Sequence, residues 1–131
     1  MTNFVLFKSL KRPPKPNTCL MAPDGFCLAA ETDFAMTELA TAPDTLFQAL
    51  VEMIEADRRW NKLKTSPETR QLKFVATTGL MRFKDDVDIE VIPLENGGST
   101  LAIYSRSRLG YSDLGANRKR VNDLIERLPT N

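Results

Sequence analysis

Four arginines and one lysine lie within the fifteen residues "RSRLGYSDLGANRKR", which run from Arg106 to Arg120. Guanidinium groups bind carboxylates and phosphates through forked pairs of N–H donors. The run contains two glycines, which allow close approach of the backbone, and it leads into a predicted helix whose first amide groups favour anions. These features predict an anion site. Its candidate ligands are Arg106, Arg108, Ser112, Asn117 and Arg118.

A second interpretation of the same arginines is an internal network of ion pairs. Side chains two residues apart on a strand point to one face of the sheet, so Arg106 and Arg108 would form a row. An antiparallel partner strand would place carboxylates opposite that row. The residues of the predicted network are Arg82, Asp85, Asp86, Asp88 and Asp113. Exposed pairs contribute only about 0 to 1 kcal/mol each, so stability alone is a weak reason for them and both interpretations stay open.

The absence of histidine narrows the chemistry that the chain can perform. Histidine is the usual general base near neutral pH, the usual partner of serine and cysteine nucleophiles and the commonest metal ligand, and the sequence has none. Asp85 and Asp86 could converge in a turn, but no further ligand pattern accompanies them. We therefore expect no catalytic residues, no cofactor and no metal, and we disfavour an enzymatic activity while leaving it open.

The overall charge argues against a polyanion as partner. The formal net charge is +1 at pH 7, so electrostatic recognition must use a local patch. The basic run has acidic neighbours and, beyond Tyr104 and Tyr111, no row of aromatic side chains on which bases could stack. We therefore disfavour nucleic acid as a partner.

Length and composition predict a single soluble domain. The 131 residues can form one core but lack the material for a second. No stretch approaches the roughly 18 to 20 apolar residues that cross a bilayer, and the opening residues lack a signal-peptide pattern. We therefore expect a cytoplasmic protein without a membrane span, in which Cys19 and Cys27 are free thiols.

Prolines set the N-terminal part of the chain apart. They forbid a regular helix and disfavour a central strand over the segment from Lys8 to Cys27. The prolines concerned are Pro13, Pro14, Pro16 and Pro23. We expect residues 1–30 to form an extended arm and residues 31–131 to form the domain.

Alternation and helical spacing predict the elements of that domain. The first helix is expected to begin with Thr41 as its cap and to bury a stripe from Leu46 to Ile54. The polar segment 58–70 is expected to be a loop or a ragged helix end, and "KDD" and Asn96-Gly97 are expected to be turns. The strands are expected near 32–39, 71–79, 87–94 and 99–108, and the last helix from Asp113 to Leu128. This order predicts an α+β fold, with a curved antiparallel sheet of about four to five strands and two helices on one face.

Three stretches resemble a known family. They are "PNTC" from Pro16 to Cys19, "MRFKDDVDIEV" and "SRSRLGYSDLGANRKRV". Together they are similar to the bacterial and plastid family called domain of unknown function 1499, which is typified by a Pro-Asn-Cys start, an Arg-Phe-x-Asp-Asp-Val strand and a Ser-Arg-x-Gly-x-Ser-Asp-Leu-Gly close. Thr18 separates Asn17 from Cys19 here, unlike the family pattern. The resemblance implies a domain to which no activity is assigned.

The expected function is a non-enzymatic binding module for a small anionic or amphipathic ligand, or for a protein partner. A first alternative is a purely structural or assembly module, in which the Arg/Asp motif is an internal salt-bridge network. A second alternative is a carrier of a hydrophobic ligand such as a lipid, because a curved sheet gripped by helices commonly encloses an apolar pocket.

Overall fold

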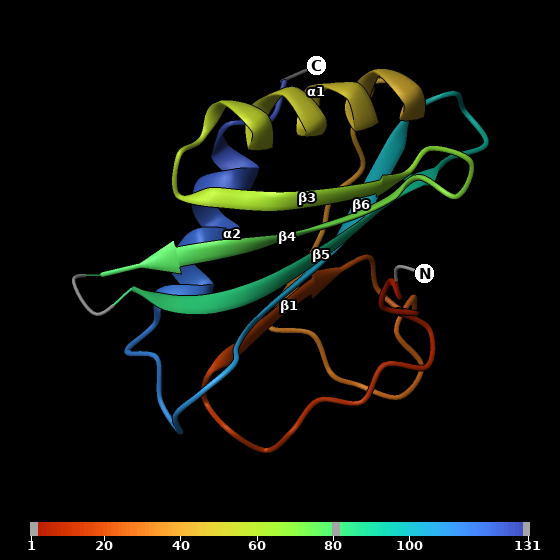
Figure 1. Cartoon of the computed structure of the whole chain (residues 1–131). Coiled ribbons are helices and arrows are strands. Elements are labelled where there is room, and N and C mark those ends of the chain that lie inside the picture. The colour runs from red at the N-terminus through yellow and green to blue at the C-terminus, as the bar shows by residue number, and fades with distance from the viewer. Residues whose placement is uncertain (1–2, 80–81, 130–131) are drawn as a thin grey trace.

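Figure 1 shows the chain as a computed structural model, which describes residues 3–79 and 82–129. Met81, at the start of the second family stretch, lies outside these residues. The elements, in order, are β1 (Thr18–Ala22), β2 (Phe34–Ala35), α1 (Pro43–Ala56), β3 (Trp60–Ser66), β4 (Gln71–Thr78), β5 (Phe83–Pro93), β6 (Ser99–Ser107) and α2 (Ala116–Glu126).

The strands of the described residues form one curved, six-stranded sheet in the order β2-β1-β6-β5-β4-β3. The short pair of β1 and β2 is parallel, and the other neighbours are antiparallel. The α+β class and the curved antiparallel sheet are therefore confirmed, with six strands in place of four or five.

The hairpin between β5 and β6 sets the register of the arginines. Asp86 lies opposite Arg106, and Asp88 lies opposite Tyr104. Asn96-Gly97 forms the connecting turn as predicted, but only Gly97 has a positive φ, of 89°. The next residue must also be glycine, because a Cβ at Gly98 would collide with the backbone carbonyl of Leu39.

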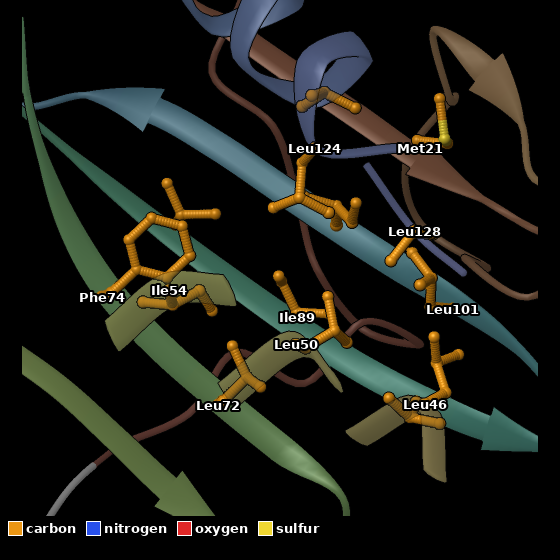
Figure 2. Close-up of a cluster of buried hydrophobic side chains, with 14 of the residues drawn as sticks. Met21, Leu46, Leu50, Ile54, Leu72, Phe74, Ile89, Leu101, Leu124 and Leu128 are labelled. Carbon is orange, nitrogen blue, oxygen red and sulfur yellow. The ribbon is translucent and has the colours of Figure 1, made fainter. Parts of the chain in front are cut away.

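Both helices cover one face of the sheet, where the main core lies. Figure 2 shows leucines and an isoleucine of α1 pointing at apolar side chains of the sheet, with Leu124 and Leu128 beside them. Leu46, Leu50 and Ile54 of α1 are completely buried, at helical spacing. The predicted stripe of the first helix is thus confirmed as core.

The N-terminal segment covers the other face of the sheet. Phe7 is only 2% exposed and packs in a second cluster with Leu20, Ala22, Ala102 and Tyr104. β1 lies between β2 and β6, inside the stretch that the prolines disfavoured as a central strand. That expectation was wrong for residues 18–22, because Pro16 and Pro23 flank the strand without entering it.

Several other boundaries differ from those predicted. The strand expected at 32–39 is reduced to β2, and the segment expected to be a loop at 58–70 contains β3. The "KDD" residues lie inside β5 rather than in a turn. Ala42, not Thr41, is the N-cap of α1, and α2 begins at Ala116 after Gly115.

No helix among the described residues combines the length and the apolar character that crossing a bilayer requires.

Candidate functional site

Arg120 of α2 lies at the centre of a buried polar network between α2 and the sheet. Its Nη2 pairs with Oδ2 of Asp85 on β5 at 2.8 Å, and the two side chains are only 5% and 3% exposed. Its Nη1 donates to Oγ of Ser105 at 3.0 Å and to Oδ1 of Asn117 at 2.8 Å. The guanidinium therefore ties α2 to both central strands.

Asn117 extends the network to the N-terminal segment. Its Nδ2 donates to the carbonyl oxygen of Asn17 at 2.9 Å and to Oγ of Ser107 at 2.9 Å. The same amide group lies 2.6 Å from a carboxylate oxygen of Asp113, which also accepts the backbone N–H of Asn117. In turn, Nδ2 of Asn17 donates to the carbonyl oxygen of Gly110 at 2.8 Å. Asn117 thus joins β6, α2 and the residues before β1.

Burial is the largest influence on the pKa of Asp85. Desolvation raises the pKa of its carboxyl, more than the charge of Arg120 and the hydrogen bonds from Arg120 and Ser107 lower it. Burial also acts to raise the pKa of Asp113, but hydrogen bonds from Asn117 and Gly115 outweigh it and the net pKa is lowered. Arg120 is therefore the main group that offsets the burial of the Asp85 carboxylate.

A second set of ion pairs occupies the face that the N-terminal segment covers. Nη1 of Arg106 binds Oδ1 of Asp88 at 2.8 Å, and Asp88 is only 2% exposed. The other oxygen of Asp88 accepts the backbone N–H of Val5 at 3.0 Å. Arg108 forms two hydrogen bonds to Asp86, at 3.0 and 2.9 Å. The arginine row faces the carboxylates across the strands, as the period of two predicted.

The five residues expected to bind an anion are not brought together. Arg106 and Arg108 are paired with aspartates, while Asn117 is buried on the helix side of the sheet. Arg118 stacks over the ring of Phe34, with 4.2 Å from the guanidinium carbon to the ring centroid. Oγ of Ser112 accepts the backbone N–H of Leu114 at 3.3 Å.

The residues expected to form a salt-bridge network fall into separate groups. Asp85 pairs on the helix side of the sheet, and Asp86 and Asp88 pair on the other. Asp113 caps the start of α2 through the backbone N–H groups of Gly115 and Asn117. Arg82 is exposed, and among the described residues no carboxylate lies within 4 Å of its guanidinium.

Arg82 instead lines a cleft between α2, the start of β3 and the end of β4. The cleft has a volume of about 570 Å³, and Arg120 lies in its wall. Its charged lining consists of Arg58, Arg59, Arg82, Lys119, Arg120 and Asp123. Arg58, Arg82 and Lys119 are exposed and have no carboxylate within 4 Å among the described residues. The cleft is thus a concave, positively charged site.

One rim of the cleft is held by Asp57. Its carboxylate binds Arg59 at 2.9 Å and Arg127 at 3.2 Å, and both guanidinium groups lie over the ring of Trp60. The hydrogen bond from the Arg59 side chain is the main cause that lowers the pKa of Asp57 to about 2. Arg59 is therefore already paired, with Asp57, at the rim of the cleft.

The family model described as "Protein of unknown function (DUF1499)" matches residues 11–128. The chain belongs to the DUF1499 family. In this DUF1499 domain the three stretches that carried the resemblance meet in one place, since they supply Asn17, Asp85 and the residues from Ser105 to Arg120 of the buried network. A search of curated proteins finds no significant match. The family description assigns no activity, so a function has to be inferred from the geometry of the domain.

Sequence reasoning missed the cleft and the role of Arg120. The cleft joins residues near 58–61, the segment 77–79 with Arg82, and residues of 116–123, and the first of these segments was expected to be a loop or a ragged helix end. Asp85 was assigned to a turn, which hid its place on the helix side of β5. The spacing of three between Asn117 and Arg120, which puts both on one face of a helix, was the available signal.

Proposed function

We propose that this DUF1499 domain is a non-enzymatic binding module for a small anionic ligand, which it holds in the cleft beside α2. The observation that supports the proposal is the set of three exposed cations, Arg58, Arg82 and Lys119, that line one cleft without a carboxylate partner among the described residues. The volume of about 570 Å³ lies within the range of sites for small molecules.

The lining favours a ligand with a modest apolar part as well as a charge. Trp60, Ala116 and the threonines of β4 share the cleft with the cations. Guanidinium and ammonium groups would bind the carboxylate, phosphate or sulfate of such a ligand, and the apolar side chains would contact its body. No step of bond making or breaking is part of this proposal.

A purely structural module is the second candidate, and a specific observation favours it. Arg106, Arg108 and Arg120 each pair with an aspartate of β5, so the Arg/Asp motif has a complete role inside the fold. The two candidates differ in the cleft, because a structural module gives Arg58 and Lys119 nothing to bind.

Thermal unfolding in the presence of phosphate, sulfate and citrate tests the proposal. A ligand that binds only the folded state stabilises it by about 2.7 kcal/mol at a hundred times its dissociation constant, which raises Tm by several degrees. We expect at least one anion to raise the Tm of the wild type at constant ionic strength. Arg58→Gln and Lys119→Gln should each reduce that rise.

Lys64→Gln is the matched control, because Lys64 is an exposed lysine of β3 outside the cleft. It removes one charge and should leave the response to the anion unchanged. Equal responses of the wild type and all three variants across the panel would leave the structural module as the better account.

We also propose a reducing compartment, the cytoplasm, as the location of the protein. Cys19 and Cys27 are free thiols in the structure, which supports that proposal. Both thiols should react with a thiol reagent in the denatured protein without prior reduction. A requirement for a reductant would contradict this location.

The two thiols should react at different rates in the folded protein. Cys19 is 1% exposed, and its burial, followed by the charge of Asp33, raises the pKa of its thiol to about 11. The thiolate is the reactive form, so Cys19 should react much more slowly than the half-buried Cys27. Labelling at pH 7.5 followed by peptide mass analysis measures both rates.

A further inference from the structure

One end of the molecule exposes a cluster of large apolar side chains. Leu109, Tyr111 and Leu114 lie in the loop between β6 and α2 and are 79%, 66% and 97% exposed. Phe83, at the start of β5, is 55% exposed. We call these four side chains the apolar end. A folded domain rarely gathers such residues in one place unless the surface contacts something.

The β6–α2 loop and the start of β5 lie at the same end of the sheet. The backbone N–H of Arg108 donates to the carbonyl oxygen of Lys84 at 3.3 Å, which joins the residues next to Leu109 and Phe83. Arg82 and Lys119 line the same cleft, so the start of α2 also lies beside this end. Figure 1 shows the loop before α2 on the side of the sheet where β4 ends and β5 begins.

The loop is held in a conformation that exposes Leu114. Leu114 has a φ of 54°, in the left-handed region that leucine rarely adopts. Its backbone N–H is bound by Ser112, and Asn17 binds the carbonyl oxygen of Gly110. The fold thus fixes a strained and almost fully exposed leucine, although its side chain adds nothing to the core.

Cations surround the apolar end, whereas the nearby carboxylates are already occupied. Arg82, Lys84 and Lys119 are exposed there, and the exposed Lys15 lies two residues before Asn17, whose side chain binds Gly110 of the loop. Asp85 is paired with Arg120 and Asp86 with Arg108, while Asp113 of the loop has no cation partner among the described residues and accepts the backbone N–H groups of Gly115 and Asn117. The whole chain has a net charge of only +1, so this end is distinctly more positive than the rest. Its combination of apolar and basic groups complements the surface of an anionic lipid bilayer.

We propose that the apolar end docks the protein on anionic membrane surfaces without crossing them. Leu109, Leu114 and Phe83 enter the interface between headgroups and acyl chains, and Tyr111 takes the interfacial position that tyrosine favours. The surrounding lysines and arginine contact the lipid phosphates and carboxylates. A second copy of the chain fits this surface poorly, because docking two such ends would bring like charges together. The apolar end shares Arg82 and Lys119 with the cleft, but docking on a membrane does not require a ligand in the cleft.

Sedimentation with lipid vesicles tests this surface. We expect the wild type to bind vesicles of phosphatidylcholine with about 30 per cent phosphatidylserine at least about ten-fold more tightly than vesicles of phosphatidylcholine alone. Leu109→Ser combined with Leu114→Asn should weaken binding to the anionic vesicles about ten-fold or more, because it removes apolar groups while asparagine tolerates the backbone of residue 114. Lys15→Gln with Lys84→Gln should weaken binding several-fold and make it less sensitive to salt.

The matched control is Leu6→Ser combined with Leu28→Ser, since these leucines are 68% and 78% exposed but lie in the N-terminal segment. This control and the cleft variant Arg58→Gln should bind vesicles like the wild type. The proposal would be overturned if the Leu6→Ser and Leu28→Ser control lost as much vesicle binding as the Leu109 and Leu114 variant. It would also be overturned if the wild type did not prefer anionic vesicles. Self-association in sedimentation velocity that the Leu109 and Leu114 changes abolish would overturn it as well, since the end would then be an interface between copies.

Discussion

Replacing Arg120 with methionine is expected to lower the free energy of unfolding by about 3 to 5 kcal/mol, because the change leaves the carboxylate of Asp85 buried without its partner. Both side chains are almost completely buried, and Arg120 also donates to Ser105 and Asn117. Urea denaturation, followed by the fluorescence of Trp60 and by circular dichroism, measures the loss. Arg108→Met is the matched control. It breaks a pair whose arginine is 45% exposed, so it should cost about 1 kcal/mol or less.

A double substitution separates the stranded charge from the lost packing. Asp85→Asn removes the charge that Arg120→Met strands, so the double variant should be more stable than Arg120→Met alone. A double variant as unstable as the sum of the single ones would show that the pair does not act as a unit.

The pH dependence of the stability of Arg120→Met is a second, independent test of the buried charge of Asp85. In the wild type, burial raises the pKa of Asp85 above its value in the unfolded chain, and loss of Arg120 removes the main opposing effect. The folded state then binds the proton more tightly than the unfolded state, so stability falls as the pH rises above about 4, the pKa of an unperturbed aspartate. The deficit of Arg120→Met relative to the wild type should therefore be smallest near pH 4 and grow toward pH 7.

The parts of the fold that the sequence predicted have a strong local period. The stripe in α1 and the alternation in β5 identify their elements because each buries its apolar side chains against the same core. β3 escaped prediction because it is a polar edge strand in which only Trp60 is buried. β1 escaped because four of its five residues are buried, on both faces of the sheet, which gives it no alternation.

The interactions of the candidate site likewise divide into those that the sequence could predict and those that it could not. The pairing of Arg106 and Arg108 with aspartates of β5 could be predicted, because the period of two and the Asn96-Gly97 turn fix which side chains meet. The pairing of Arg120 with Asp85 could not be predicted, because it depends on how α2 is rotated over the sheet. The cleft could not be predicted either, because its cations come from three segments that are distant in the sequence.

Phe7→Ala is expected to destabilise the protein by about 3 to 5 kcal/mol, although the sequence placed Phe7 in an extended arm. Phe7 is 2% exposed and contacts the face of the sheet opposite the helices, together with Leu20 and Tyr104. Its neighbours fix the segment further, since Gln71 donates to the carbonyl oxygen of Val5, whose N–H binds Asp88. Leu6→Ala is the matched control and should change stability by about 0.5 kcal/mol or less, because Leu6 is 68% exposed.

The shape of the unfolding transition will show whether the N-terminal segment is part of the cooperative unit. Leu20 and Tyr104 face Phe7, while their neighbours Cys19 and Ile103 face the helices, so two strands connect both clusters. Loss of packing on one face should therefore weaken the other, and Phe7→Ala should unfold in a single transition at a lower urea concentration. An early, separate phase or a loss below about 1 kcal/mol would mean that the segment only lies on a domain that is stable without it.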